Sequence, residues 1–432
     1  MRSRFFGGVH PKENKEMAGH ALPEELDPPS QVIIPLKQHI GVICKPLVKV
    51  GDKVVMGQKI GDAEGLSVPV HSSVSGTVVA IERRPNIMGE VESIVIENDF
   101  RDTRSSSLER HDSIDGLSDD EILHIIREAG LVGMGGATFP TDVKSSVVSG
   151  QIDTVIANIC ECEPYITSDD TLICNFTEYV LKGVSIIARM IKPKRVVLAV
   201  EDNKAEGIER LRSLLPSYPG IEIDVLKTRY PQGAEKQLIF SVTGREVPSG
   251  KLPKDVGCIV FNAATYASIA KAVYEGEPSI RRIVTVTGEG IEKPRNVIVR
   301  IGTPIEHAIK QCGGLKDGTI KVLAGGPMMG ACVSDLSSPI VKGTNAITAL
   351  MERKAVEDPK CIRCGKCFDH CPMRLQPLYM NRYAQANDLD ALRRLHVIDC
   401  MECGCCAYVC PARIPLVENF RKAKKALREA GK

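Results

Sequence analysis

The sequence lacks long apolar runs. Its longest ones, such as Val196–Val200, have the length of a strand, whereas a membrane-spanning helix needs roughly 18 or more apolar residues. We therefore expect no transmembrane segment. Residues 1–16 contain no apolar core of the kind found in secretory signals, so we also expect no export signal.

An excess of charge of one sign is also missing. The chain has 56 Lys and Arg residues against 54 Asp and Glu residues, which gives a formal net charge of +2. With so small a net charge, the protein as a whole is not attracted electrostatically to nucleic acid or to an anionic membrane. We therefore expect no nucleic-acid partner. At roughly 150 residues per domain, the 432 residues predict a globular protein of about three domains.

The N-terminal region, residues 1–100, predicts a β barrel-sandwich module, because short β-rich runs alternate with Gly-Asp turns from residue 30 onward. The pattern resembles lipoyl and biotinyl carrier domains, in which a lysine at a hairpin tip holds the cofactor. Residues 63–72, at the corresponding tip, contain no lysine. This excludes a swinging-arm carrier and favours a structural module.

A polar, Ser-rich linker is predicted at residues 101–118. It ends at Ser118, which with Glu121 three residues later has the pattern of a helix capping box. From residue 119 to 275, β-rich segments alternate with helical ones. This alternation predicts a three-layer α/β domain with a largely parallel sheet.

Two further modules complete the predicted multidomain α/β fold. Residues 276–340 return to short strands around one helix, which indicates a small β-grasp-like (SLBB-like) module. Residues 350–432 are rich in cysteine and end in a basic helix, Leu416–Ala430. The sixteen cysteines of so long a chain favour metal ligation in a reducing compartment, the cytosol, over a disulfide framework.

The cysteine-rich block contains the motif C-x2-C-x2-C-x3-C-P twice, which is typical of two [4Fe–4S] clusters whose fourth thiolate comes from the other motif. Paired zinc sites are the alternative, but they leave several cysteines and both Cys-Pro endings unexplained. The segment between the motifs has helical periodicity, which predicts an α-helical two-cluster ferredoxin domain. The surplus Cys405 is assigned to packing. The ligand sets are Cys361, Cys364, Cys367 and Cys410 for one cluster, and Cys400, Cys403, Cys406 and Cys371 for the other.

A glycine-rich stretch, GLVGMGGATFPTDVK at residues 130–144, fits neither a P-loop nor a dinucleotide-binding G-x-G-x-x-G fingerprint. A tight turn is the simplest interpretation. However, two clusters transfer electrons one at a time. Flavin is the usual cofactor that passes the electron pair of a hydride donor on to such clusters as single electrons. The stretch offers bare amides for a phosphate or a flat ring, Phe139 for stacking and Lys144 for an anion.

Acidic and amide side chains follow the next predicted strand. Asn158, Glu161 and Glu163 stand at its carboxyl end, where α/β sheets bind ligands, and carboxylates suit ribose hydroxyls and the nicotinamide amide. Cys160 and Cys162 lie between them. They are either redox-active or small buried apolar side chains.

These segments resemble the NADH-binding, 51 kDa-type subunit of respiratory complex I, including the later segments 230–235 and 261–265. From end to end the chain resembles the C subunit of the Rnf (Rsx) electron-transport complex. It departs from the complex I pattern at Met134, Thr138, Cys160 and Ala234. The resemblance implies FMN bound by Gly133, Gly135, Gly136, Lys144, Asn158, Tyr230, Gly233, Asn262 and Thr265. It implies NAD(H) stacked near Phe139, Glu161, Glu163 and Glu235.

The resemblance further implies a peripheral subunit, on the cytoplasmic face of the membrane, of an ion-translocating ferredoxin:NAD+ oxidoreductase. Its partners would be a ferredoxin-like iron–sulfur subunit and membrane-spanning subunits that carry the ion path. No residue is expected to act as a catalytic acid or base, because the cofactors carry the chemistry. The alternatives are an electron-relay adaptor without nucleotide binding and the flavin-linked NADH subunit of a soluble hydrogenase or formate dehydrogenase.

Overall fold

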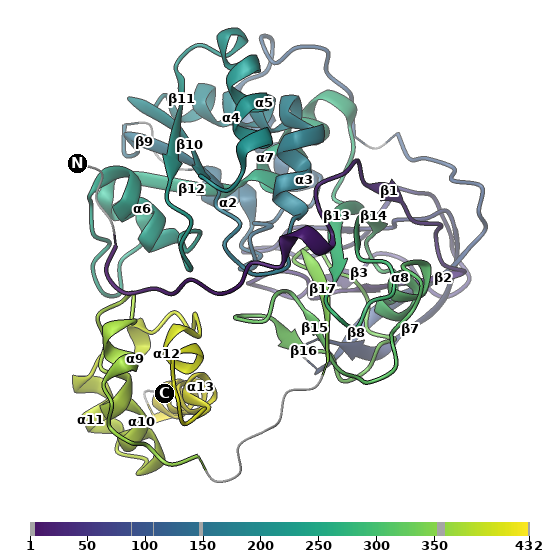
Figure 1. The fold of residues 1–432 in the computed structure, drawn as a ribbon. Coiled ribbons are helices and arrows are strands. Elements are labelled where there is room, and N and C mark those ends of the chain that lie inside the picture. The colour runs from purple at the N-terminus through teal and green to yellow at the C-terminus, as the bar shows by residue number, and fades with distance from the viewer. Residues whose placement is uncertain (1–4, 88, 107, 147–149, 352–358, 431–432) are drawn as a thin grey trace.

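The computed structural model describes residues 5–87, 89–106, 108–146, 150–351 and 359–430 (Figure 1). Within them, the chain forms four modules. An N-terminal strap, residues 5–20, contains the short 3-10 helix η1 (Lys15–Met17) and contacts three of the modules. The strap runs between the α/β module and the C-terminal helices in Figure 1.

The first module is a β sandwich. One antiparallel sheet has the order β2 (Gln31–Pro35), β8 (Gly89–Asn98), β7 (Gly76–Asn86) and β4 (Lys53–Val54); the other has the order β3 (Lys45–Pro46), β5 (Lys59–Asp62) and β6 (Val70–His71). Alternate apolar side chains of the two sheets, among them Ile34, Ile60 and Ile96, are fully buried between them. The sequence indicated this module by its short β-rich runs separated by Gly-Asp turns.

The second module is built on a parallel sheet in the order β11 (Ile221–Leu226), β10 (Arg195–Glu201), β9 (Thr154–Ile159) and β12 (Cys258–Asn262). Both faces of this sheet are covered, so its strands read as continuous apolar runs. One face packs against α1 (Asp119–Glu128), α3 (Ser168–Asn175), α4 (Thr177–Ile191), α5 (Ala205–Leu214) and α7 (Ala263–Glu275), and the other against α6 (Glu235–Thr243).

The predicted capping box is present at the start of α1. The Ser118 hydroxyl accepts from the Glu121 amide, while the Glu121 carboxylate accepts from the Ser118 amide. The remaining short elements of this module are α2 (Thr141–Ser145), η2 (Leu215–Ser217) and η3 (Pro253–Val256).

The third module is a six-stranded sheet with one helix, α8 (Ile305–Gln311). Its outer strand, β1, comes from just after the strap, and another, β17, comes from beyond residue 340. The order is β1 (Glu24–Glu25), β14 (Arg295–Arg300), β13 (Arg281–Thr287), β17 (Ala346–Met351), β15 (Thr319–Ala324) and β16 (Ala331–Cys332).

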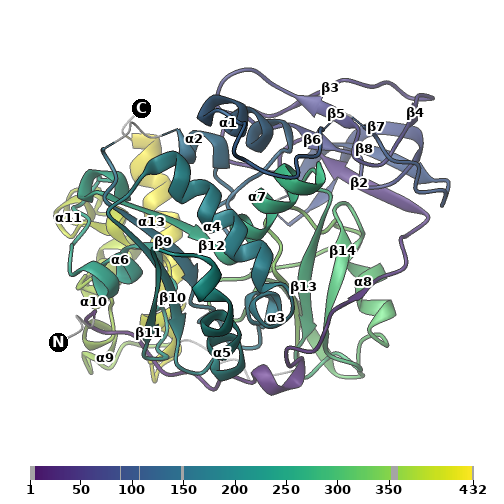
Figure 2. The ribbon, with the colours of Figure 1, turned by 90° about the horizontal axis from the view of Figure 1, so that it is seen from above.

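The fourth module is helical and closes on its own small core, in which Met380, Leu392 and Phe420 are buried. Figure 2 shows its helices on one side of the α/β module and the two β-rich modules on the other. Its last helix has the bounds predicted from the sequence. The elements are α9 (Lys366–Asp369), α10 (Pro377–Gln385), α11 (Leu389–Arg394), η4 (Val397–Asp399), α12 (Cys405–Tyr408) and α13 (Leu416–Ala430).

Throughout the described ranges, no single helix combines the length and the apolar character needed to cross a membrane. Among the described residues, α3 and α4 taken together pass such a test, and they are bent by 93° relative to each other.

Candidate functional site

The glycine-rich stretch forms a tight loop at the carboxyl edge of the parallel sheet. The Gly133 amide donates to the Phe139 carbonyl at 2.9 Å, and the Thr138 amide donates to the Gly133 carbonyl at 3.2 Å. Gly135 and Gly136 are exposed between these bonds. Gly136 has a φ of 114°, and a Cβ there would meet no atom within 4 Å. The loop therefore presents bare backbone to an open space, as a cradle for a phosphate or a flat ring requires.

The floor of this loop comes from the start of α7. A Cβ on Gly135 would lie 3.3 Å from Asn262 Cβ, and the Met134 amide donates to Thr265 Oγ1 at 3.0 Å. Asn262 caps α7 by accepting from the Ala264 amide. The structure thus brings the glycines, Asn262 and Thr265 together.

Asp169 belongs to the same site but was missed in the sequence. Its carboxylate accepts from the Asn262 amide group at 2.6 Å. Burial, followed by the nearby Glu161 carboxylate, raises the pKa of Asp169. The only sequence signal was its position at the polar start of a helix, which is usually a cap.

Lys144 and Glu235 form an ion pair at the site. Lys144 Nζ lies 2.8 Å from Glu235 Oε1 and 5.2 Å from the centre of the Phe261 ring, and both charged side chains are partly exposed. Phe139 is half-buried beside the loop. A cation held in this way can receive an anionic ligand by releasing its carboxylate partner.

Asn158 and Gly233 lie next to each other. Asn158 Nδ2 donates to the Gly233 carbonyl at 2.8 Å, and a Cβ on Gly233 would lie only 2.1 Å from the Cys160 carbonyl oxygen. Only glycine therefore fits at residue 233. Burial raises the pKa of the Cys160 and Cys162 thiols, which disfavours the reactive thiolate at both positions.

Glu161 and Glu163 are engaged with the protein itself. Glu161 is buried and accepts from the amides of Asp169 (2.8 Å) and Asp170 (3.3 Å) at the start of α3. Glu163 accepts from the amides of Met328 (3.1 Å) and Met329 (2.7 Å), which belong to the β-grasp-like module. Burial raises the pKa of Glu163 to about 7, although these two amides act in the opposite direction.

Tyr230 contacts the helical module. Its hydroxyl donates to the Cys403 carbonyl oxygen at 2.7 Å, and the side chain is fully buried. Gln237, in the first turn of α6, donates to the Pro372 carbonyl at 3.2 Å. Both contacts join the α/β module to the second set of cysteines.

Four cysteines of the helical module line one cavity, which is bounded by α10 and α13 on its other sides. Backbone amides point at two of the sulfurs: Leu375 donates to Cys371 Sγ and Glu402 to Cys400 Sγ, each at 3.4 Å. Converging thiols with amide donors are the environment of an iron–sulfur cluster. The cysteines that line this cavity are Cys371, Cys400, Cys403 and Cys406.

The other cysteine motif has the same loop shape. Arg363 and Gly365 have positive φ values of 56° and 79°, matching 60° and 81° at Glu402 and Gly404. Burial, followed by the neighbouring thiols of Cys364 and Cys410, raises the pKa of Cys367, so Cys410 lies beside the first motif. Cys361 and Cys364 are exposed. Both donor sets thus fit a thiolate-bound cluster, as the glycine loop fits a flavin.

Family models match the chain in four consecutive parts. The RnfC barrel sandwich hybrid domain matches residues 3–101, the Nuo51 FMN-binding domain residues 126–271, the SLBB domain residues 283–331, and the 4Fe-4S dicluster domain residues 353–411. These matches confirm the predicted fold class and the assignment of FMN and [4Fe–4S] clusters as cofactors.

Curated relatives match over nearly the whole chain. The C subunit of the Na(+)-translocating ferredoxin:NAD(+) oxidoreductase complex of Acetobacterium woodii is 42% identical over 98% of this chain and 97% of its own length. The proton-translocating counterpart of Clostridium ljungdahlii is 42% identical over 100% and 95%. The C subunit of the ion-translocating oxidoreductase complex of Rhodobacter capsulatus is 40% identical over 98% and 83%.

Among solved structures, a chain of an NAD+-reducing [NiFe]-hydrogenase in the air-oxidized state has a similar fold. The TM-score is 0.53 at 19% identity, over 72% of this chain and 63% of that one. At this identity the likeness concerns the fold alone.

Proposed function

We propose that the glycine loop of this chain is the place where NAD(H) and FMN exchange electrons. The premise is that the chain belongs to the RnfC family, the C subunits of ion-translocating ferredoxin:NAD+ oxidoreductase (Rnf) complexes. The family resemblance predicted from the sequence is confirmed by the full-length relatives. We also propose which residues hold each cofactor, and that this chain uses NAD(H).

One observation carries the proposal: the first turn of α6 contacts both candidate cofactor sites. Glu235 pairs with Lys144 beside the glycine loop, and Gln237 donates to Pro372, which follows the cysteine Cys371. Two residues on one helical turn therefore connect the flavin cradle with a cluster cavity.

The flavin site would be built from groups that bind without reacting. The amides of Gly135 and Gly136 and the Lys144 ammonium would bind the phosphate and ring edge, while Gly133, whose amide is used inside the loop, would hold the turn in shape. Asn158, Gly233, Asn262 and Thr265 would shape the floor and walls, whereas the Tyr230 hydroxyl is used in the contact with Cys403. When bound, FMN converts the electron pair of the nicotinamide into single electrons, and the clusters conduct these singly.

The nicotinamide would stack over the same loop, with Phe139 on one side and Glu235 toward the ribose hydroxyls. Glu161 and Glu163 act through position, because their carboxylates are held by amides of α3 and of residues 328–329. They fix the segment that bears Asn158. Within this scheme no side chain has to transfer a proton.

The two cysteine sets would act in series. The set around Cys371 and Cys403 touches the α/β module, so we place it nearest to the flavin. The other set includes the exposed Cys361 and Cys364, so we place its cluster at the surface where a ferredoxin-like iron–sulfur subunit docks. By the same family relation we propose that the chain is peripheral, on the cytoplasmic face, and that membrane-spanning subunits translocate the ion.

The test is an anaerobic NADH titration of the full chain after reconstitution with FMN and iron. We expect bleaching of the flavin absorbance followed by reduction of the clusters. In Glu235→Gln, NADH should reduce the flavin more slowly while FMN content stays unchanged, and Glu246→Gln serves as a control outside the site. A chain that retains its clusters but neither binds FMN nor responds to NADH would instead be an electron-relay adaptor.

A further inference from the structure

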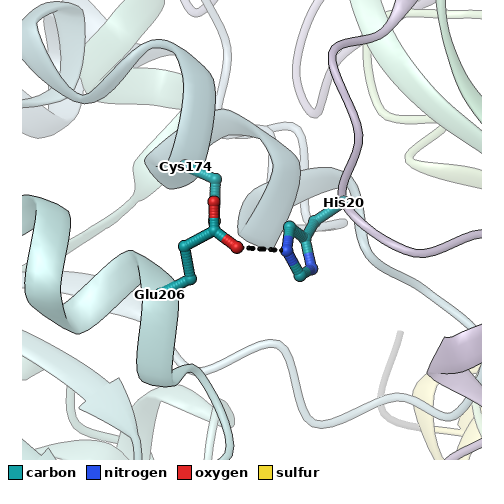
Figure 3. Close-up of side chains that lie close together, drawn as sticks. All are labelled: His20, Cys174 and Glu206. Atoms are coloured by element: carbon teal, nitrogen blue, oxygen red, sulfur yellow. Dashed lines mark hydrogen bonds and ion pairs between the residues drawn. The ribbon is translucent and has the colours of Figure 1, made fainter.

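A second group of potential ligands lies away from the flavin and cysteine sites, where the strap passes over α3 and α5 (Figure 3). It consists of His20 from the strap, Cys174 from α3 and Glu206 from α5. One ligand atom from each residue lies within 4.8 Å of the others. His20 Nε2 and Glu206 Oε2 are 2.7 Å apart.

A hydrogen bond from a side chain and the close packing of two helices hold these three residues in place. Asn175 Nδ2 donates to the His20 carbonyl at 3.0 Å, which fixes the strap against the end of α3. A Cβ on Gly207 would lie 2.3 Å from Ile173 Cδ1, so the glycine permits the close approach of α5 to α3. That approach places Glu206 beside Cys174. The cluster is therefore a product of packing between three distant segments.

A fourth donor stands at the back of the cluster. Asp170 is largely buried, with Oδ1 3.9 Å from Cys174 Sγ and Oδ2 3.7 Å from His20 Nδ1. Lys204 Nζ, 3.8 Å from Asp170, is a neighbouring cation. Lys15 also acts on the Asp170 carboxylate.

We propose that His20, Cys174 and Glu206 bind a zinc ion, with Asp170 or a water as the fourth ligand. Imidazole nitrogen, thiolate sulfur and carboxylate oxygen are the donor types that zinc takes in four-coordinate sites. The thiol of Cys174 loses its proton as the sulfur–zinc bond forms, so uptake of one ion releases about one proton. With one thiolate and one carboxylate, the bound ion is neutralised.

Zinc uptake has to overcome the high pKa of the Cys174 thiol. Burial, followed by the carboxylates of Asp170 and Glu206, raises the pKa of Cys174 to about 12. The thiolate is thus disfavoured until a cation arrives. His20 and Glu206 are exposed enough to move the short way needed to close around an ion, with side chains 42% and 66% exposed.

Zinc at this site would fasten the strap. Upstream of His20, the Gly8 amide donates to the His370 carbonyl of the helical module, and Val9 pairs with Tyr230. Lys15 Nζ donates to the carbonyls of Glu161, Glu163 and Ile166. An ion at His20 would therefore tie a segment that touches both the α/β and the helical modules.

The experiment uses the full chain with its clusters and flavin, stripped with a chelator and titrated with Zn2+. We expect about one zinc retained per chain and an X-ray absorption spectrum with one sulfur at about 2.3 Å and nitrogen or oxygen at about 2.0 Å. His20→Gln and Cys174→Ser should each weaken zinc binding by at least about tenfold. Cys332→Ser, at an exposed cysteine on β16, should leave it unchanged.

Three results would overturn the proposal. They are failure of the chain to retain zinc, a shell of four sulfurs (zinc in the cluster motifs), and equal zinc affinity in the parent, His20→Gln and Cys174→Ser chains. Because His20 and Glu206 are surface side chains, His20→Gln and Glu206→Gln should keep the fold. Unchanged flavin and iron content in both variants confirms that a loss of zinc is local.

Discussion

The phenolic hydroxyl of Tyr230 donates a hydrogen bond to the backbone carbonyl oxygen of Cys403 at 2.7 Å. Tyr230 follows β11, the edge strand of the parallel sheet, while Cys403 belongs to a cysteine loop of the helical module. Val9 of the strap pairs with the backbone of Tyr230. One buried residue therefore joins three parts of the chain at the edge of a proposed cluster site, through its side chain and its backbone.

Tyr230→Phe should loosen this junction. The loss of one buried hydrogen bond costs about 1 kcal/mol, which corresponds to about a fivefold change in an equilibrium. We expect NADH to reduce the flavin at an unchanged rate and the clusters about fivefold more slowly in stopped-flow absorbance. Tyr266→Phe is the matched control, because Tyr266 is equally buried but bonds to Ile156 within the α/β module. Equal cluster reduction in Tyr230→Phe and the parent would contradict the prediction.

Gly136→Ala should remove FMN from the chain. Gly136 has a φ of 114° and faces open space, so the methyl group would strain the backbone and intrude into the cradle. Gly220→Ala is the control, because Gly220 also has a positive φ (84°) and open space but lies in a distant turn. The flavin absorbance that remains after gel filtration should fall at least about tenfold only in Gly136→Ala. A similar loss in both variants would point to general strain.

The cysteine sets predict how iron is lost. Cys371→Ser should empty the cavity that it shares with Cys400, Cys403 and Cys406, and lower the iron content from about eight to about four per chain. Cys405→Ser should retain both clusters. Iron analysis and low-temperature EPR of the reduced protein measure the outcome, and full iron retention in Cys371→Ser would refute its assignment as a ligand.

Glu201 predicts a pH-dependent stability. It is fully buried, and burial raises its pKa to about 7, against the opposing effect of Lys204 and Lys15. Because the folded chain binds this proton more tightly than the unfolded chain, whose glutamates titrate near 4.5, the contribution of Glu201 is full below pH 4.5. It is then lost as the pH rises through about 7. The loss is on the order of 3 kcal/mol in the free energy of unfolding.

Glu201→Gln should therefore flatten this dependence. The unfolding midpoint of the α/β module, followed by circular dichroism from pH 5 to pH 8, should fall less steeply in the variant than in the parent. Glu209→Gln, at an exposed glutamate on α5, should keep the parent slope. If the Gln variant and the parent have the same slope, Glu201 does not titrate in this range.

Much of the fold was predictable because short, local sequence patterns determine it. The capping box at Ser118 and Glu121 needs only four consecutive residues, and helix Leu416–Ala430 was predicted with the bounds that the structure has. The strands at 154, 195 and 258 were marked by apolar runs, since a parallel sheet is buried on both faces. The fixed spacing of the cysteines predicted iron–sulfur clusters without knowledge of the fold, because that spacing forms a thiolate-lined loop.

The orientations of the site residues were decided only by tertiary structure. Glu161 and Glu163 share a short acidic segment, yet one caps α3 and the other binds the amides of Met328 and Met329 in a different module. The same is true of Tyr230, which turns toward Cys403. The residue type determined which chemistry each side chain offers. The direction of the side chain depends on which buried polar group from a distant segment needs a hydrogen-bond partner. Only the folding of the chain brings those two groups together.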